Sequence, residues 1–520
     1  MRLADFDTEF TPSQSTPPVY TARVDAAGWR RVAAQVAGAG GRLVALWGSD
    51  RRADADAAVV ISAAYASAEG LLWVQLPVVD VAADFPDLTP WFAGAERMQR
   101  ALADLLGVGA ADALDQRPWL DHGLWPPGFK PLRGAAEVTS AADGASAAPY
   151  DFVRVQGDGV HEIAVGPVHA GIIEPGHFRF SVVGEKVLRL EQRLRYTHKG
   201  IERRFTELRP VDGVRLAGRV SGDSTVAYAF AYCMALEAAA AASVSPRAAA
   251  LRGLLLEYER IANHLGDLGA IGNDAGLAIA LAQFSRLRED WLRLAGELFG
   301  HRLLMDCIVP GGVARDLDAA AGARLVALGR AIEVEVLAMR RLVEEHAGLQ
   351  DRLIGTGRVS SELAAQLGLT GLAARASGIA IDLRCLFPVA PYDRLAVRMA
   401  CRPNGDVAAR VLLRFDEIAE SLRLIRVLIE QLPAGLVRGE IVVPSEPAFG
   451  IGWVEGWRGE VLVALELAPQ DGVASIRRCH CHDPSWQNWP VLEHAVIGNI
   501  VPDFPLINKS FNLSYAGQDL

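Results

Sequence analysis

Lysine is scarce in this 520-residue chain, where it occurs only at positions 130, 186, 199 and 509. The formal net charge at pH 7 is −10. Nucleic-acid binding depends on clustered Lys and Arg that neutralise phosphates and release counterions. The composition therefore argues against nucleic acid as a partner.

Long apolar runs are also missing. A membrane-spanning helix needs about 20 consecutive apolar residues, and the nearest candidate, residues 229–244, is shorter and contains Glu237. The N-terminus has no basic segment followed by an apolar one, so no secretory signal is predicted. We expect a protein on the cytoplasmic side that reaches a membrane only through partner subunits.

The chain has six cysteines and no CxxC pair, which is the spacing that metal clusters and redox-active disulfides use. The run Cys479-His480-Cys481-His482 carries metal-capable side chains. In an extended strand these side chains alternate between two faces and cannot surround one tetrahedral ion. We therefore predict that this run is an ordinary strand and that the chain binds no metal.

Residues 134–149 contain no large apolar side chain, which predicts a flexible linker between residues 20–133 and 150–520. The first part mixes strand-like runs (43–47, 71–79) with helical ones (28–37, 91–106). The second part begins with a small sheet within 165–190, continues with long helical patterns over 211–432 and a strand at 460–467, and ends in an irregular tail from Asn488. The predicted fold class is α+β, with a small N-terminal α/β domain followed by a mainly helical bundle domain that carries a small β-sheet.

One helix of the bundle is especially clear. Ser245 followed by Pro246 is a favourable N-cap and first-turn pair. Apolar residues then recur at spacings of three and four along one face, as in a core helix: Leu251, Leu254, Leu255, Tyr258, Ile261, Leu265 and Leu268.

The second part contains a series of motifs at residues 166–169 (GPVH), 174–180, 196–202, 259–264 (ERIANH), 310–313, 375–378, 382–384 and 454–460 (VEGWRGE), and at 498–499 with 503–506. Together they resemble the large subunit of group 4 nickel–iron hydrogenases, the hydrogenase-4 and formate hydrogenlyase type, and the quinone-site (49 kDa) subunit of respiratory complex I. The first part resembles the 30 kDa subunit of complex I through residues 85–90, Arg100, 104–107 and 131–133.

This resemblance implies a peripheral subunit of an oxidoreductase complex on the cytoplasmic face of the inner membrane. The implied partners are a small subunit that carries a [4Fe–4S] cluster and antiporter-like membrane subunits. The chain's own cysteines cannot supply such a cluster. We find no Gly-rich dinucleotide fingerprint between a strand and a helix, so any use of NADH is expected in another subunit.

In hydrogenases of this family two CxxC pairs hold the nickel–iron centre, and the matching positions here are Ser221, Ser224, Ser514 and Gly517. Thiolate is the soft ligand that suits such a centre, whereas serine offers a hard, protonated hydroxyl. We therefore expect no nickel–iron centre. Complex I, which also lacks these cysteines, uses the vacated space as a quinone pocket. The tyrosine of that pocket matches Gly222 here, and the loop at 170–174 differs from that of complex I. The sequence therefore leaves quinone binding undecided.

Two candidate residues each allow two interpretations. Glu202 matches the glutamate that relays protons in the family, a role suited to a buried carboxylate with a raised pKa; alternatively it is a helix-start carboxylate paired with Arg203 or Arg204. His169 can hydrogen-bond an acceptor or a water in the cavity, or simply stabilise its turn.

The remaining candidates fall into two sets. The resemblance places the first set at polar positions around the cavity, where Arg–carboxylate braces are the expected role; the set is Arg219, Arg375, Asp382 and Arg384. The second set would line the vacated metal position, and its members are Ser221, Asp223, Ser224 and Ser514. These four residues would form a small polar pocket that holds water, the head group of an electron acceptor, or no ligand. His264 is expected to cap or pack its helix.

Three functions remain open. The first is an electron-transfer subunit of a hydrogenase-4-like, complex I-related membrane complex coupled to ion translocation. The second is a degenerate, non-catalytic scaffold that holds the iron–sulfur subunit; a closed site around Ser221 and Ser514 would favour it, and an open tunnel would favour an acceptor. The third, an active formate hydrogenlyase subunit, requires nickel.

Overall fold

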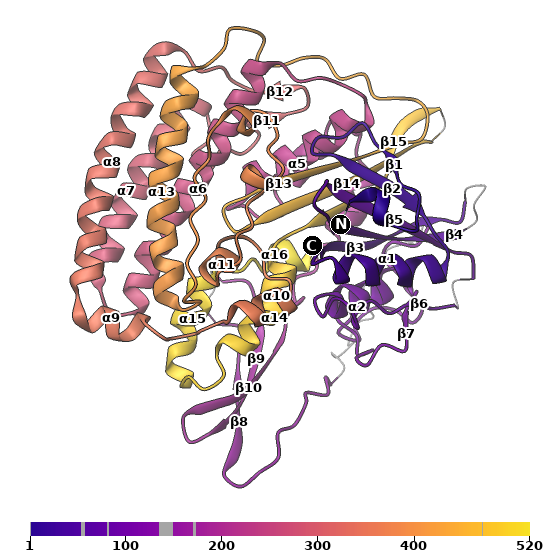
Figure 1. The fold of residues 1–520 in the computed structure, drawn as a ribbon, viewed down its shortest axis with the longest axis horizontal. Helices are drawn as coiled ribbons and strands as arrows, with labels where there is room; N and C mark the ends of the chain where they lie inside the picture. The colour runs from indigo at the N-terminus through magenta and orange to yellow at the C-terminus, as the bar shows by residue number, and fades with distance from the viewer. Residues whose placement is uncertain (1, 54–57, 81–82, 135–148, 170–172, 471) are drawn as a thin grey trace.

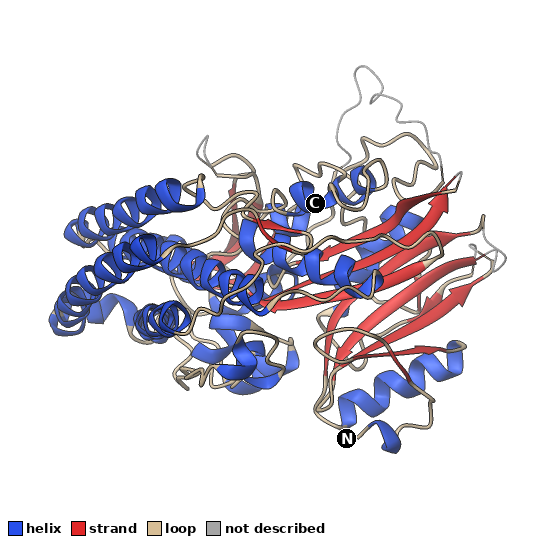
Figure 2. Ribbon diagram, turned by 90° about the horizontal axis from the view of Figure 1, so that it is seen from above, coloured by secondary structure: helices blue, strands red, loops and turns tan. Residues whose placement is uncertain are grey.

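The structure is a computed structural model that describes residues 2–53, 58–80, 83–134, 149–169, 173–470 and 472–520. Most of the predicted linker and the first half of the rebuilt loop, residues 170–172, lie outside the described residues. Long helices gather on one side of the molecule, and two sheets lie beside them (Figures 1 and 2). The predicted α+β class is confirmed.

The first sheet belongs to the N-terminal part and has the order β1-β2-β5-β4-β3. β2 and β5 pair in parallel, and the other neighbours are antiparallel. Every residue of β4 is buried, because helices cover one face of the sheet and a second sheet covers the other. The elements are β1 Thr11–Pro12, β2 Val19–Arg23, α1 Ala26–Gly38, β3 Arg42–Arg51, β4 Ala58–Ala66, β5 Leu71–Val78, β6 Phe85–Pro86, α2 Ala95–Leu106 and β7 Ala110–Ala111.

The second sheet is the antiparallel β13-β14-β15, formed by Ala448–Glu455, Glu460–Gln470 and Val473–His482. Helix α5, Thr225–Ala239, packs closely against β13 and β14. Glycine makes this approach possible: a Cβ on Gly452 would lie 1.8 Å from the Ala231 carbonyl oxygen. The predicted strand at 460–467 is thereby confirmed, as is the strand placement of the Cys-His-Cys-His run.

The bundle consists of long helices. Ser245 caps α6 as predicted, since its Oγ accepts a hydrogen bond from the Ala248 amide at 3.1 Å. The long helices are α6 Pro246–Asp274, α7 Ala278–Phe299, α8 Ala319–Glu345 and α13 Val407–Glu430. Shorter elements connect them: α3 Ile201–Phe205, α4 Gly213–Ala217, β11 Ile308–Val309, β12 Gly312–Val313, α9 Ala347–Leu353, α10 Ser361–Gln366, α11 Gly371–Ala376 and α12 Leu383–Leu386.

A three-stranded sheet, β8 Val160–Val165, β9 His177–Val183 and β10 Lys186–Arg193, projects from the body beside the C-terminal helices (Figure 1). The prediction of an irregular tail is wrong. Residues from Asn488 onward lie largely in α14 Ser485–Ala495, α15 Phe504–Phe511 and α16 Ala516–Asp519. Pro490 lies inside α14, where the buried Trp489 and Leu492 hold the helix in place despite it.

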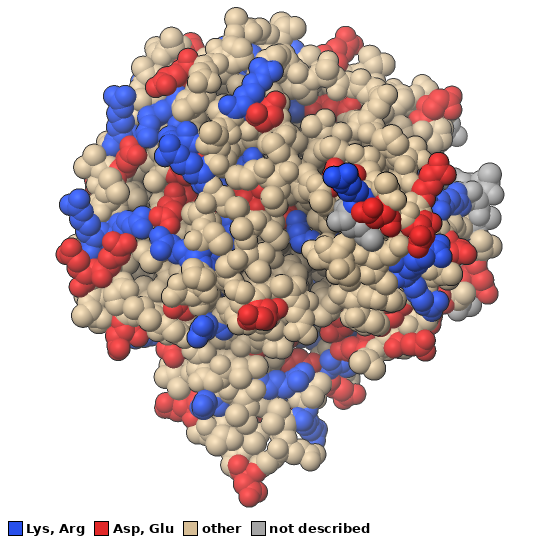
Figure 3. Space-filling view, viewed as in Figure 1, with Lys and Arg blue, Asp and Glu red and all other residues tan. Residues whose placement is uncertain are grey.

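The two larger sheets meet where β3 contacts β15. The ring of Trp47 stacks on His480 with centroids 5.2 Å apart, and the guanidinium of Arg478 donates to the Gly48 carbonyl at 2.8 Å. On the outer surface, basic and acidic side chains are interspersed over the face seen in Figure 3. No helix among the described residues has both the length and the apolar character needed to cross a bilayer.

Candidate functional site

The structure brings together the positions that the sequence matched to the metal ligands. Ser221 lies just before α5, whereas Ser514 lies between α15 and α16, yet their Oγ atoms are 3.0 Å apart. Ser514 Oγ also accepts a hydrogen bond from the Gly517 amide at 2.8 Å. A Cβ on Gly517 would lie 2.4 Å from a carboxylate oxygen of Asp483, so this position has no room for a side chain.

Arg458, from the turn between β13 and β14, extends among these residues. Its Nη1 donates to Asp223 Oδ1 at 3.0 Å and to Ser224 Oγ at 3.3 Å, and its Nη2 donates to Asp223 Oδ2. Asp223 in turn accepts the Ser221 hydroxyl at 2.7 Å. We call Ser221, Asp223, Ser224, Arg458 and Ser514 the serine–arginine centre.

Electrostatics keep this centre ionised. Burial alone would raise the pKa of Asp223, but the Arg458 charge and the hydrogen bonds of Arg458 and Ser221 outweigh it and lower that pKa. The pKa of Arg458 is raised, because the Asp223 carboxylate outweighs the burial that opposes its charge. Sequence reasoning assigned Arg458 no role, although it lies in the quoted VEGWRGE motif.

Three predicted residues lie in a different, fully buried set of charges. Arg384 donates two hydrogen bonds to the Asp382 carboxylate, from Nε at 3.0 Å and from Nη2 at 2.6 Å. Arg375 donates to Glu417 at 2.7 Å and to Glu455 at 2.8 Å. The full set, which we call the buried charge network, is Glu257, Arg260, Arg375, Asp382, Arg384, Glu417 and Glu455.

The buried charge network contains four carboxyl groups and only three guanidinium groups. Burial and the neighbouring Asp382 carboxylate raise the pKa of Glu455 to about 7. Asp382 shows the opposite shift: burial opposes its charge, but Arg384 and Arg375 lower its pKa to about 2. His264 is also buried here, and its Nε2 lies 2.8 Å from Glu417. Of the two roles expected for it, it packs in the core beside this network and does not cap its helix. No hydrogen bond among the described residues joins Arg375, Asp382 or Arg384 to the serine–arginine centre.

Glu202 occupies a third place, at the start of α3 and beneath β15. Its carboxylate accepts hydrogen bonds from Arg478 at 2.9 Å and from His480 Nδ1 at 2.7 Å. The pairing with Arg203 or Arg204 is wrong for Arg203, which instead donates to the Pro131 and Gly134 carbonyls. Burial favours a raised pKa for Glu202, but Arg478 and His480 outweigh it and lower that pKa, contrary to the premise of the proton-relay interpretation.

The last two candidates lie at the surface. His169 Nε2 lies 2.7 Å from the Gly176 carbonyl, which is the geometry of a side chain that stabilises its turn. Arg219 holds Asp306 through two hydrogen bonds, at 2.7 and 2.8 Å. The sequence predicted an Arg–carboxylate brace for Arg219, and the structure has one. It lies at the exposed surface, however, and not at the cavity.

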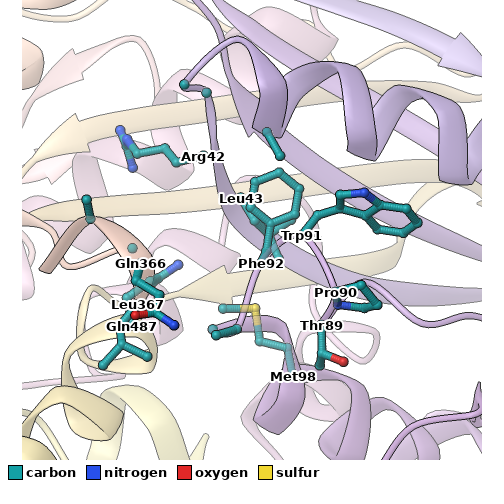
Figure 4. Close-up of a pocket in the computed structure, with 17 residues that line it drawn as sticks. Arg42, Leu43, Thr89, Pro90, Trp91, Phe92, Met98, Gln366, Leu367 and Gln487 are labelled. Atoms are coloured by element: carbon teal, nitrogen blue, oxygen red, sulfur yellow. The ribbon is translucent and has the colours of Figure 1, made fainter. Parts of the chain in front are cut away.

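The pocket shown in Figure 4 contains none of the predicted site residues. Its volume is about 400 Å³, and it lies between the N-terminal part (Trp91, Phe92, Met98) and residues of the second part such as Gln366 and Gln487. Among the described residues, this pocket and four other prominent ones are all lined by residues outside the serine–arginine centre.

The chain is similar in sequence to known subunits of respiratory complexes and hydrogenases. The model of the 49 kDa subunit of respiratory-chain NADH dehydrogenase matches residues 274–448, and that of the 30 kDa subunit matches residues 22–141. The carbon monoxide-induced hydrogenase of Rhodospirillum rubrum is 30% identical over 68% of this chain and 97% of its own length. This chain belongs to the complex I and group 4 hydrogenase family. Hydrogenase-4 component G of Escherichia coli is 29% identical over 92% of this chain and 84% of its own length.

A solved relative agrees with the fold of this family. A chain of the membrane-bound sulfane sulfur reductase, an archaeal respiratory membrane complex, superposes with a TM-score of 0.64 at 24% identity, over 69% of this chain and 98% of that chain. This likeness concerns the fold alone. The two family models show the fused arrangement of a 30 kDa-like and a 49 kDa-like part.

The residues of the serine–arginine centre do not fit the nickel–iron centre of the hydrogenase relatives. Hydroxyl groups replace soft thiolates, Gly517 has no ligand atom in a side chain, and the Arg458 cation lies where a metal cation would be repelled. Among the described residues, no group of three or more His, Cys, Asp or Glu could hold a metal ion.

Proposed function

We propose that this chain is the large subunit of a membrane-bound, hydrogenase-4-like oxidoreductase complex that transfers electrons without a nickel–iron centre and is coupled to ion translocation. The observation that carries the proposal is the Arg458–Asp223 ion pair between Ser221, Ser224 and Ser514. A fixed ion pair takes the place of the metal chemistry of the hydrogenase relatives, while the fold of the subunit is retained.

The proposal includes partners and domain limits. The partners are a small subunit that carries a [4Fe–4S] cluster and antiporter-like membrane subunits, and they would hold the chain at the cytoplasmic face of the inner membrane. A quinone is the acceptor that the complex I relatives suggest. The proposed domains are residues 20–133 and 150–520, and the matches at 22–141 and 274–448 support this division.

A non-catalytic scaffold is the second candidate. One observation favours it: hydroxyl and ion-pair contacts join the side chains of the serine–arginine centre to one another, and none of the five pockets described above is lined by them. An active formate hydrogenlyase subunit, by contrast, requires nickel at a centre whose side chains do not fit it.

The test is to purify the tagged chain with its native complex from host membranes in mild detergent. We expect iron without nickel, together with an iron–sulfur small subunit and antiporter-like proteins in the same sample. Stoichiometric nickel would overturn the proposal, as would a chain that purifies without iron and without partners.

Electron transfer is then measured in the same complex with a soluble quinone analogue. The Arg458→Gln variant is compared with Arg219→Gln, which breaks an exposed ion pair of similar geometry. A loss confined to Arg458→Gln, with the complex still assembled, supports an acceptor site at the serine–arginine centre. Equal activity of both variants, or no activity in the wild type, favours the scaffold.

A further inference from the structure

A small cavity lies where the N-terminal part meets the second part, and no residue of the serine–arginine centre lines it. Its volume is about 30 Å³, and β3 and α2 line it on one side through Trp47 and Ala101. On the other side it is lined by Arg195, His198, His480 and Trp486, among others. We call this cavity the interdomain chamber. Glu202 and Arg478 also line it.

Several polar atoms of this lining are buried and have no hydrogen-bond partner among the described residues. Those that can only donate are Nε and Nη2 of Arg195, Nε1 of Trp47 and Nε1 of Trp486. Arg195 is 3% exposed and Trp486 is 4% exposed, so bulk solvent does not satisfy them. Arg195 Nε lies 3.9 Å from the Asp519 carboxylate, a long ion pair that leaves it without a hydrogen bond. A buried donor without a hydrogen bond costs about 1–3 kcal/mol, so several of them around one cavity indicate a bound partner.

The two histidines of the chamber supply acceptors. His198 Nδ1 lies 2.6 Å from the Asp519 carbonyl oxygen, and His480 Nδ1 lies 2.7 Å from Glu202 Oε1. Each Nδ1 faces an acceptor and must therefore carry the proton. Burial lowers the pKa of both rings, which keeps them neutral. Each Nε2, also unpaired, is then an acceptor.

Only a ligand that both donates and accepts satisfies this lining. A small anion would accept from Arg195 and Trp486, but it would also face the lone pairs of two neutral imidazoles. Water matches both kinds of group, and a cavity needs roughly 10–15 Å³ for each water molecule. The chamber volume of about 30 Å³ is sufficient for about two.

We propose that the interdomain chamber is a binding site for ordered water, in which about two molecules join Arg195 and Trp486 to His198 and His480. This water connects the Glu202–His480 pair with the His198–Asp519 pair in one hydrogen-bonded chain of the second part, along its boundary with the N-terminal part. The inference does not depend on the electron-transfer proposal, because it concerns only the packing of this chain.

The experiment is a crystal or cryo-EM structure of the assembled protein at a resolution that shows ordered water. We expect density in the chamber within hydrogen-bond distance of Arg195 Nε or Nη2 and of at least one histidine Nε2. An empty chamber overturns the proposal. A crystal soaked in bromide provides a second arm: an anomalous peak in the chamber would identify an anion site and overturn the assignment of water.

A matched pair of variants tests the site in solution. Ala101→Leu fills the chamber from α2, whereas Ala103→Leu makes the same change on the same helix at a residue that does not line it. Water-17O relaxation dispersion, which detects long-lived internal water, should lose signal only in Ala101→Leu. Equal signals in the two folded variants would contradict the proposal, and the wild-type density decides if Ala101→Leu does not fold.

Discussion

At the scale of single residues, the structure separates ion pairs that hold a fixed charge from a carboxyl group that does not. Asp223 and Asp382 face arginines in bidentate geometry, and their pKa values are lowered despite burial. Glu455 and Glu417 both pair with Arg375. Because the network has one more carboxyl group than guanidinium groups, Glu455 is the carboxyl group that binds a proton most readily. Such a group links stability to pH.

The pKa of Glu455 rises from 4.5 to about 7 on folding. Its contribution to stability is therefore fully present below pH 4.5 and is lost as the pH rises through 7. Replacing it with glutamine, which mimics the protonated form, removes this dependence. We measure the free energy of unfolding of Glu455→Gln and of the wild type by urea denaturation. The difference between them should shift in favour of the variant by about 1–3 kcal/mol between pH 5 and pH 8.5.

Glu417→Gln is the matched control for that measurement. Burial opposes the charge of Glu417, but Arg375 and His264 hold its pKa well below the usual range. Its contribution to stability is present above pH 4.5 and is lost as the pH falls, so the variant should be less stable than the wild type at neutral pH. The same pH trend in both variants would show that Glu455 does not hold the extra proton.

At the scale of elements, the packing of α5 against β13 determines where the serine–arginine centre lies. α5 begins directly after Ser224, and the Glu259 carboxylate accepts the first amides of the helix, those of Val226 and Ala227, at 2.7 and 3.2 Å. Arg458 follows β13 on the other side. Any displacement of the helix from the strand therefore separates Arg458 from Asp223.

Gly452→Ala tests this arrangement. Its Cβ would meet the Ala231 backbone at 1.8 Å, and backbone atoms cannot move aside as a flexible side chain can. We expect a loss of roughly 3 kcal/mol or more in the free energy of unfolding. Gly38→Ala in α1 has nothing within 4 Å of the new Cβ and should be neutral or slightly stabilising. A thermal melt that ranks the two variants equally would be inconsistent with close packing at Gly452.

At the scale of the whole molecule, the two parts of the chain share a core. Trp47 and Trp73 of the first sheet pack in one buried cluster with Ile451, Trp453 and Leu462 of the second sheet. Polar contacts reinforce it, since Ser49 Oγ donates to Glu466 at 2.5 Å. We therefore expect the parts to unfold together, in a single calorimetric transition.

Trp47→Ala should weaken this connection. The change removes the stack on His480 and leaves a cavity between the sheets, at a cost of about 3–5 kcal/mol. We expect the single transition to broaden or split in scanning calorimetry. The half-buried Trp91, which lines the open pocket of Figure 4, is the control, and Trp91→Ala should keep one transition. Two transitions in the wild type would show that the parts fold independently.

Local patterns in the sequence determined most of the elements and the family. The Ser245 cap, the periodicity of α6 and the apolar strand-like runs of β3 and β5 each depend on neighbours a few residues apart, so they could be predicted. The irregular tail was wrong because α14 depends on burial of Trp489 by distant elements. The match of Ser221, Ser224, Ser514 and Gly517 to the metal positions of the hydrogenases stays a prediction from the motifs that flank them.

The tertiary structure alone decided what surrounds those positions. Ser221 and Ser514 are separated by 293 residues, Glu202 and His480 by 278, and Arg458 and Asp223 by 235. Side chains so far apart leave no periodicity or spacing that predicts their contact. Charge pairing depends on distances of a few ångströms, and the burial that shifts each pKa depends on the packing of the whole chain. The sequence thus determined which groups are present, and folding decided which of them meet.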